Sequence, residues 1–164
     1  MSGRIIRSFA SPGGACQGLA FDGRTLWVSN GNASRIYQID PLTGTVIWSF
    51  ATPTGGAFGL AFDGRFLWHV ENSVNRVYQI DPSTGTVIRS FAAPGISTSG
   101  IAYDGRTLFI ADYGTDLIYQ IDPSTGTVIR SFAAPGANCA AIAFDGRTLW
   151  VADRTAALIY QLSL

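Results

Sequence analysis

The 164-residue sequence has no lysine, one histidine and only two cysteines. A single histidine leaves no second imidazole as a partner base, and no Cys-His pairing is present that would form a nucleophile–base pair. Glycine-rich phosphate loops and the Gly-x-Ser-x-Gly nucleophile motif are also missing. Cys16 and Cys139 are too few for a disulfide framework or a zinc site, so we expect them to be small buried residues. They would become neighbours only if the first and last parts of the chain meet in a ring.

Net charge and long apolar runs are lacking as well. The 11 basic residues, all arginine, balance 11 acidic residues and are spread along the chain. This pattern argues against a nucleic-acid footprint and against a membrane-surface patch. No apolar run approaches the length of a transmembrane helix, and residues 1–7 lack the apolar core of a signal peptide. We therefore expect a cytoplasmic protein, with the compartment otherwise left open.

A seven-residue stretch, Phe-Asp-Gly-Arg-Thr-Leu-Trp, occurs four times in the chain, with one or two substitutions in some copies. The copies span residues 21–27, 62–68, 103–109 and 144–150. The spacing is 41 residues each time, and four such periods account for the whole chain. A period of this length indicates a repeat architecture.

Each repeat reads as four short strands. In the first repeat they are expected at 18–21, 25–28, 35–39 and 45–50. The β-branched and aromatic residues favour strands, and no segment has helical periodicity. An Asp-Gly turn joins the first two strands, because glycine accepts the positive φ of a tight hairpin. An Asp-Pro-x-Thr-Gly turn joins the last two.

Four strands in about 40 residues are typical of a β-propeller blade. We therefore predict an all-β fold, a single β-propeller domain over 1–164 with four four-stranded blades. The blades are expected at 14–50, 55–91 and 96–132, with the last formed by 137–164 plus 3–9. Residues 3–9 resemble 126–132, an outermost strand, so the N-terminal strand is expected to close the last blade and remove an exposed edge.

Two sequence patterns carry a resemblance to known repeats. Gly-Leu-Ala-Phe-Asp-Gly-Arg-Thr-Leu-Trp-Val and Ile-Tyr-Gln-Ile-Asp-Pro-x-Thr-Gly-Thr-Val-Ile are similar to blades of the NHL, YVTN and PQQ-type propellers. The resemblance covers the entire chain and implies a propeller. Residues 78–95 and 119–136 are identical at all 18 positions, which indicates recent amplification of a blade or an engineered sequence.

Four repeats permit two assemblies. One is a monomeric four-bladed propeller, and the other is a homodimer in which two half-rings form eight blades. A lone half-ring would expose two apolar blade faces. Since the similar repeats usually close rings of about six to eight blades, we favour self-association as a homodimer.

The alternation of strand direction puts two kinds of turn on opposite faces of the ring. The Asp-Gly-Arg and Asp-Pro turns form one side, which we call the constant face. The loops before the first strand and after the second strand form the variable face, where the repeats disagree and where binding is expected. The candidate binding residues are Gln17, Phe58, Ser99, Asn138, Tyr113 and Arg154.

One column of oxygen-bearing side chains ends the second strand of each repeat. It consists of Asn30, Glu71, Asp112 and Asp153. Four such side-chain oxygens at the mouth of a central channel could bind Ca²⁺. The alternative, which we favour, is that each side chain caps its own loop through backbone N–H groups.

The functional expectation is a non-catalytic scaffold or binding module, not an enzyme, with no cofactor apart from possible Ca²⁺. The alternative is a metal-assisted lyase or hydrolase, resembling a lactonase, with a site near Glu71. His69 lies two residues before Glu71, on the same side of an expected strand. Its column otherwise holds Val28, Ile110 and Val151, so an apolar core position is the simpler interpretation.

Overall fold

The computed structural model describes residues 5–56 and 58–164, and these residues form fifteen strands. The first eight are β1 (Cys16–Phe21), β2 (Leu26–Asn30), β3 (Arg35–Ile39), β4 (Val46–Ala51), β5 (Leu60–Phe62), β6 (Leu67–Glu71), β7 (Arg76–Ile80) and β8 (Val87–Ala92). The rest are β9 (Thr98–Tyr103), β10 (Leu108–Asp112), β11 (Leu117–Ile121), β12 (Val128–Ala133), β13 (Cys139–Phe144), β14 (Thr148–Asp153) and β15 (Leu158–Ser163). Within the described ranges, no helix is long and apolar enough to cross a membrane.

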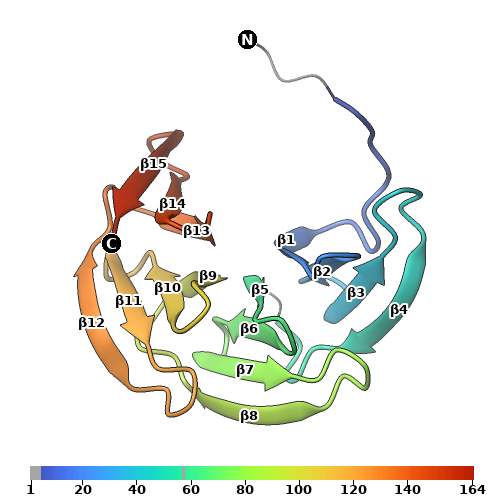
Figure 1. Ribbon diagram of the computed structural model, residues 1–164, viewed down its shortest axis with the longest axis horizontal. Coiled ribbons are helices and arrows are strands. Elements are labelled where there is room, and N and C mark those ends of the chain that lie inside the picture. The colour runs from blue at the N-terminus through green and yellow to red at the C-terminus, as the bar shows by residue number, and fades with distance from the viewer. Residues whose placement is uncertain (1–4, 57) are drawn as a thin grey trace.

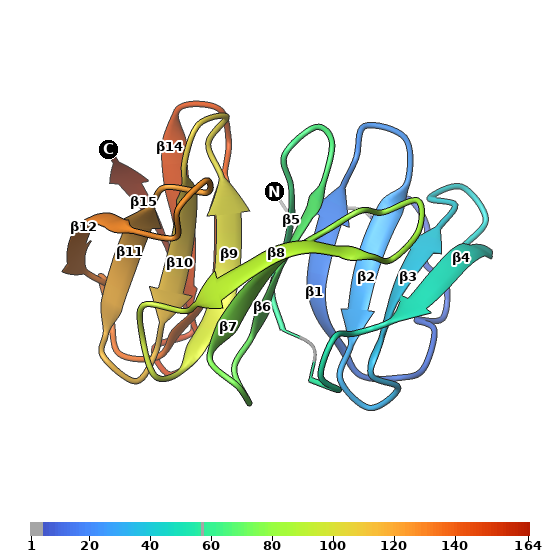
Figure 2. The ribbon, with the colours of Figure 1, turned by 90° about the horizontal axis from the view of Figure 1, so that it is seen from below.

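The strands form separate antiparallel sheets in chain order. Blade 1 is β1–β4, blade 2 is β5–β8, blade 3 is β9–β12 and blade 4 is β13–β15. The blades follow one another around an arc, with β1, β5, β9 and β13 innermost (Figure 1). Seen from below, the neighbouring sheets stand side by side with their strands running between the two faces of the arc (Figure 2). The predicted all-β propeller with four blades is confirmed.

The core lies between blades, not inside them. One cluster joins Trp27 and Ile36 of blade 1 to Leu67 and Ile80 of blade 2. A second joins blades 2 and 3, and a third joins blades 3 and 4. Each sheet thus buries both of its faces only when it has a blade on either side.

Glycine occupies the innermost strands where neighbouring blades come closest. A methyl group added at Gly59 would lie 2.5 Å from the carbonyl oxygen of Ser99, in the next blade. Gly18 and Gly100 meet the next inner strand in the same way. The fourth repeat has Ala141 in this column.

The two ends of the arc differ from the expected closed ring. Among the described strands, β15 has no outer neighbour, so blade 4 has three strands. Residues 5–9 form no strand on blade 4 and lie instead beside blade 1, across the opening of the arc (Figure 1). The expected closure of the last blade by the N-terminal strand is therefore wrong within a single chain. Residues 3 and 4 of the predicted strand lie outside the described part.

The physical reason for this difference is packing. Phe9 sits against Gly44 of blade 1, where an added methyl group would lie 2.5 Å from its ring. An Arg7 guanidinium N–H also donates to the carbonyl oxygen of Leu42 over 2.6 Å. These contacts hold the N-terminal segment beside blade 1, at the opposite end of the arc from β15.

Candidate functional site

A central cavity lies where the innermost strands converge. It has a volume of about 240 Å³, and its lining comes from β1 and β9, from the residues around β5, and from β13. Most of the lining is glycine, alanine, leucine or isoleucine; Gln17 and Ser99 provide the polar side chains. No charged side chain is among the described residues that line it. The cavity can therefore hold a small, uncharged group and offer it a few hydrogen bonds.

Two of the six predicted binding residues lie at this cavity. Gln17 and Ser99 stand at the variable-face end of β1 and β9. The Ser99 hydroxyl donates to the carbonyl oxygen of Ala140 over 2.7 Å, which fixes it at the junction of blades 3 and 4. Gln17 is exposed and packs against Gly31, in the loop after β2.

The other four predicted binding residues lie outside the cavity. Phe58 packs against the apolar cluster between blades 2 and 3. Tyr113 is an exposed residue whose hydroxyl accepts a hydrogen bond from the Asn72 amide over 3.0 Å. Asn138 and Arg154 are joined through a 3.2 Å backbone hydrogen bond in blade 4. The structure thus brings together two pairs and leaves Phe58 and Tyr113 apart from them.

The predicted column of oxygen-bearing side chains is buried beneath the variable loops. Each member binds the loops of its own blade. Asp112 shows the pattern most fully: Oδ1 accepts from the N–H groups of Gly114 and Thr115, and Oδ2 accepts from the N–H of Ser97. Asp153 accepts from the N–H groups of Thr155 and Ala156. Asp112 therefore holds both variable loops of blade 3 to its second strand, and Asp153 holds the loop that follows β14.

This arrangement does not form a shared cation site. Among the described residues, no group of three or more histidine, cysteine, aspartate or glutamate side chains could hold a metal ion. Asn30, the member from blade 1, likewise bonds its own loops, through the N–H of Ala33 and the carbonyl of Pro12. The four side chains named as possible Ca²⁺ ligands therefore point into four separate loop pairs.

Glu71 is the exception in this column because its side chain is longer. Its Oε1 accepts from the N–H of Gly56 and from the Ser73 hydroxyl, while Oε2 is buried without a partner among the described residues. His69 is fully buried on the same strand, stacked on Tyr78. Burial lowers the pKa of His69 to about 4, against the opposing effect of the Glu71 carboxylate. The imidazole is therefore neutral at physiological pH.

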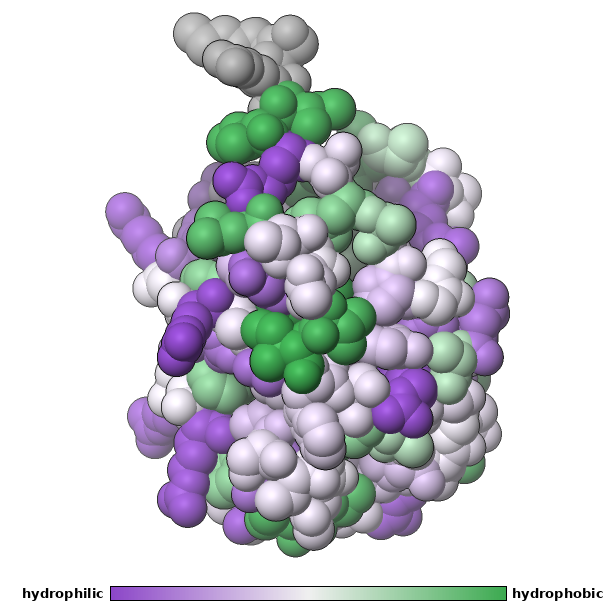
Figure 3. Space-filling model, turned by 90° about the vertical axis from the view of Figure 1, so that its right-hand side faces the viewer, coloured by the Kyte–Doolittle hydropathy of each residue, from purple (hydrophilic) through white to green (hydrophobic). Residues whose placement is uncertain are grey.

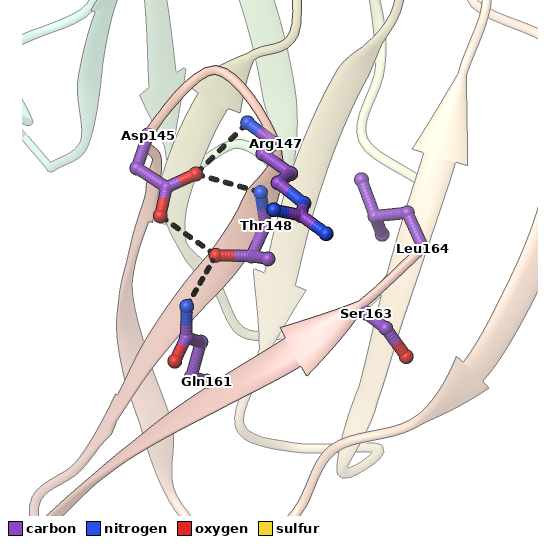
Figure 4. A pocket seen from close by; sticks show the side chains of 6 residues that line it. All are labelled: Asp145, Arg147, Thr148, Gln161, Ser163 and Leu164. Atoms are coloured by element: carbon purple, nitrogen blue, oxygen red, sulfur yellow. Dashed lines mark hydrogen bonds between the residues drawn. The ribbon is translucent and has the colours of Figure 1, made fainter.

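A larger hollow lies elsewhere, on the constant face of blade 4 (Figure 4). There, Gln161 donates to the Thr148 hydroxyl over 2.9 Å, and that hydroxyl donates to Asp145 over 2.7 Å. The same chain of bonds runs from Gln38 to Thr25 in blade 1 and from Gln120 to Thr107 in blade 3. Because it repeats from blade to blade, this network belongs to the scaffold. The hollow itself lies beside β15, where blade 4 has no outer strand.

Sequence reasoning missed one feature of the constant face. The indole N–H of Trp68 donates to Asp63 over 2.7 Å, five residues earlier. Trp27 and Trp150 make the same bond to Asp22 and Asp145. The repeated Asp-to-Trp spacing was visible in the sequence, but only the hairpin register shows that the two side chains meet.

Comparisons with known proteins give a family and a fold. A profile of the glutamine cyclotransferase family matches residues 5–139, which is most of the chain. No curated protein matches the chain in sequence.

Solved structures agree on the architecture. Glutaminyl cyclase from Myxococcus xanthus aligns with a TM-score of 0.78 at 15% identity, over 92% of this chain and 73% of that one. The computationally designed Ika4 protein aligns with a TM-score of 0.66 at 16% identity, over 99% of both chains. Kuenenia stuttgartiensis hydrazine synthase aligns with a TM-score of 0.68 at 21% identity, over 98% of this chain and 53% of that one. At these identities the structures support the fold alone.

The family match overturns one expectation and leaves another unconfirmed. The predicted non-catalytic scaffold is wrong, because a family of cyclotransferases is a family of enzymes. The sequence offered no recognisable catalytic motif, and the propeller by itself carries no chemistry. The resemblance to NHL, YVTN and PQQ-type repeats is not confirmed by the match, although the propeller itself is.

Proposed function

Because this chain belongs to the glutamine cyclotransferase family, we propose that it cyclises glutaminyl residues at the N-terminus of peptides. In this reaction the free α-amino nitrogen attacks the side-chain carboxamide carbon. A new C–N bond forms, the old C–N bond of the carboxamide breaks, and the nitrogen leaves as ammonia. The observation that carries the proposal is the family match over residues 5–139.

The central cavity is the best candidate for the substrate site. Its volume of about 240 Å³ lies below the roughly 300–1,000 Å³ of sites for drug-sized ligands. A space of this size suits one terminal residue, with the remaining peptide lying over the variable face. Gln17 and Ser99 are the polar side chains placed to bind a carboxamide there.

The uncharged lining supports the chemistry of the attack. The nucleophile must be the neutral amine, while a free α-amino group has a pKa of about 7.7–8.0. Transfer into a cavity without charged side chains disfavours the ammonium form and lowers this pKa. Holding the amine and the carboxamide within reach of each other adds the advantage of an oriented intramolecular reaction.

Ser99 is our candidate for stabilising the oxygen that gains negative charge. Its hydroxyl is a donor at the cavity wall and is engaged with the carbonyl of Ala140. Turning that O–H toward the substrate oxygen would supply one oxyanion contact.

The test is direct. A peptide beginning with glutamine is incubated with the protein and followed by mass spectrometry for the loss of one ammonia. The N-acetylated peptide is the matched control, because its blocked nitrogen cannot attack. We expect cyclisation of the free peptide well above its spontaneous rate. A rate equal to that of the protein-free solution would contradict the proposal.

A further inference from the structure

The two ends of the arc carry the two halves of an interface that already exists three times inside the chain. Ile36, Val77 and Ile118 occupy one column and are completely buried against the following blade. Ile159 of blade 4 occupies the same column and is 72% exposed. Trp150 is 37% exposed, although its equivalents Trp27, Trp68 and Phe109 are at most 2% exposed.

Blade 1 presents the complementary half. Leu19 is 63% exposed, while its equivalents Leu60 and Ile101 are at most 5% exposed, each covered by the preceding blade. Beside it, Leu26, Val28, Ile39 and Phe9 line an apolar hollow of about 400 Å³. This surface corresponds to the side of blades 2, 3 and 4 that packs against the preceding blade.

The N-terminal segment already occupies the place of an outer strand that belongs to a missing blade. Phe9 packs on Gly44 of blade 1 as Phe50 packs on Gly85 of blade 2 and as Phe91 packs on Gly126 of blade 3. Arg7 donates to the carbonyl of Leu42, as Arg89 donates to the carbonyl of Ser124. The segment therefore lies where the fourth strand of a blade preceding blade 1 would lie.

This segment is apolar and has no covering strand. Ile5 and Ile6 are 80% and 89% exposed. In the view onto the side of the molecule that carries blade 1, hydrophobic residues, drawn in green, gather toward the top of the described surface (Figure 3). Such an uncovered apolar segment favours pairing with the open sheet edge of another chain.

We propose that a second copy of this chain supplies the missing neighbour. Blade 4 (β13–β15) of the second copy pairs with residues 5–9 of the first copy and packs on its blade 1. Blade 4 of the first copy does the same for the second copy. A second copy is the occupant because this chain carries both halves of the interface, one at each end. The chain's own blade 4 is not this neighbour in the structure. The inner strands β1, β5, β9 and β13 contact one another in that order, and no comparable contact joins β13 to β1 among the described residues.

The register of the exchanged strand follows from the complete blades. In blade 3, Gln120 pairs with Arg130 and Ile118 pairs with Phe132. The equivalent pairs between copies are Gln161 with Arg7 and Ile159 with Phe9. In blade 3 the Arg130 guanidinium donates to Gln120 over 2.6 Å, so the same bond is expected from Arg7 to Gln161.

Reciprocal exchange between two copies gives one ring of eight blades and requires each arc to open further than in Figure 1, so the cavity at the axis becomes part of a wider channel that both copies line. Ala141 stands where the other repeats have glycine, so the inner strands of the two copies meet with slightly more space at the axis.

The register can be tested with two single-cysteine proteins. In a background in which Cys16 and Cys139 are replaced by alanine, one protein carries Arg7→Cys and the other carries Gln161→Cys. The two are mixed, oxidised and run on a non-reducing gel. We expect a covalent dimer in the mixture and little in either protein alone, because only the mixture places the two thiols opposite each other.

A matched control uses Arg130→Cys in place of Arg7→Cys. Arg130 occupies the same column, but its partner strand lies within its own chain, so no dimer band is expected with Gln161→Cys. A mixture that stays monomeric would overturn the proposal. So would a protein with both Arg7→Cys and Gln161→Cys that forms its disulfide only within one chain.

Light scattering provides a second test that needs no cysteine. The 164-residue chain should have the mass of two chains rather than the 17.5 kDa of one. Ile159→Arg puts a charge on the exposed end of blade 4 and should shift the mass to one chain. Ile129→Arg, at an exposed outer-strand position away from both ends, should leave two. A wild-type chain with the mass of one chain, or equal masses for the two variants, would contradict the proposal.

Discussion

The constant and variable faces of the arc are built by the same strands but are held together by different groups. On the constant face each Asp-Gly turn carries an exposed or half-buried carboxylate bonded to groups two to five residues away, as Asp63 is to Arg65, Phe66 and Trp68. On the variable face the carboxylates are buried, and Asp112 and Glu71 each join two loops that are far apart in the sequence, as Asp112 does with Ser97 and Gly114. The constant face is therefore made of local turns, whereas the variable face depends on contacts between loops.

This difference separates what the scaffold needs from what a ligand could use. The local turns repeat almost unchanged, because any blade requires them. The variable loops differ from blade to blade and lead into the inner strands that line the central cavity. Changes on the two faces should therefore have different consequences, and the substitutions below test this.

The largest expected effect is the loss of a carboxylate cap on the variable face. Asp112→Asn places an N–H group opposite backbone N–H groups, because both carboxylate oxygens of Asp112 accept hydrogen bonds. We expect the free energy of unfolding to fall by about 3 kcal/mol, since buried bonds to a charged acceptor are lost. Urea unfolding measures it.

Glu71→Gln is the matched control for this prediction. Only Oε1 of Glu71 accepts hydrogen bonds from the described residues, so the amide oxygen can replace it. The change should cost less than about 1 kcal/mol. Equal losses for the two variants would show that the buried carboxylates are not the caps described above.

The next effect concerns pH. The folded pKa of His69 is about 4, below its unfolded value of 6.5. The unfolded chain therefore takes up a proton that the folded chain does not, and stability falls as the pH drops from 6.5 toward 4. At pH 5 this costs about 2 kcal/mol.

His69→Val should remove this pH dependence. Valine already occupies the equivalent positions 28 and 151, so the replacement fits the column. Thermal unfolding of both proteins between pH 5 and 7 measures the effect. If the variant lost stability on acidification as steeply as the wild type, the slope would have to come from another group.

A smaller effect is expected on the constant face. Asp63→Ala leaves the buried indole N–H of Trp68 without its acceptor. Asp104→Ala leaves no indole N–H without an acceptor, because blade 3 has Phe109 in place of tryptophan, and the Thr107 hydroxyl that loses Asp104 still accepts from Gln120. We expect Asp63→Ala to cost about 1 kcal/mol more than Asp104→Ala in urea unfolding. The reverse order would mean that the indole bond does not stabilise the turn.

The smallest effect is expected at Arg24, an exposed residue of the Asp-Gly-Arg turn. Arg24→Ala should change the free energy of unfolding by no more than about 0.5 kcal/mol. It should also leave the cyclisation rate unchanged, since Arg24 does not line the central cavity. A clear loss of activity in the folded variant would assign the constant face a role in function.

Much of the fold could be predicted because every blade repeats the same local signals. The Asp-Gly hairpin and its glycine at positive φ, such as Gly23 at 91°, are set by neighbouring residues. The docking position of residues 5–9 could not be predicted. Their sequence matches the outer strand expected for blade 4, but Phe9 packs against Gly44 of blade 1. The sequence cannot show whether the blade in front of blade 1 comes from the same chain.

The site was predictable only in part. Gln17 and Ser99 were named because they fall at the variable ends of inner strands, and these ends converge at the axis. Asp112 and Asp153 were correctly interpreted as loop caps, since aspartate commonly bonds nearby N–H groups. The enzymatic nature of the family could not be predicted, because the sequence contains none of the common catalytic motifs.

The most direct test of the account compares Ser99→Ala with Ser131→Ala in the cyclisation of a glutaminyl peptide. Ser99 lines the central cavity, whereas Ser131 is exposed on an outer strand. The account predicts that Ser99→Ala lowers kcat/KM at least about tenfold, the loss of one hydrogen bond to the transition state, while Ser131→Ala keeps the wild-type value. Equal kcat/KM values for both folded variants and the wild type would contradict a site at the axis of the arc.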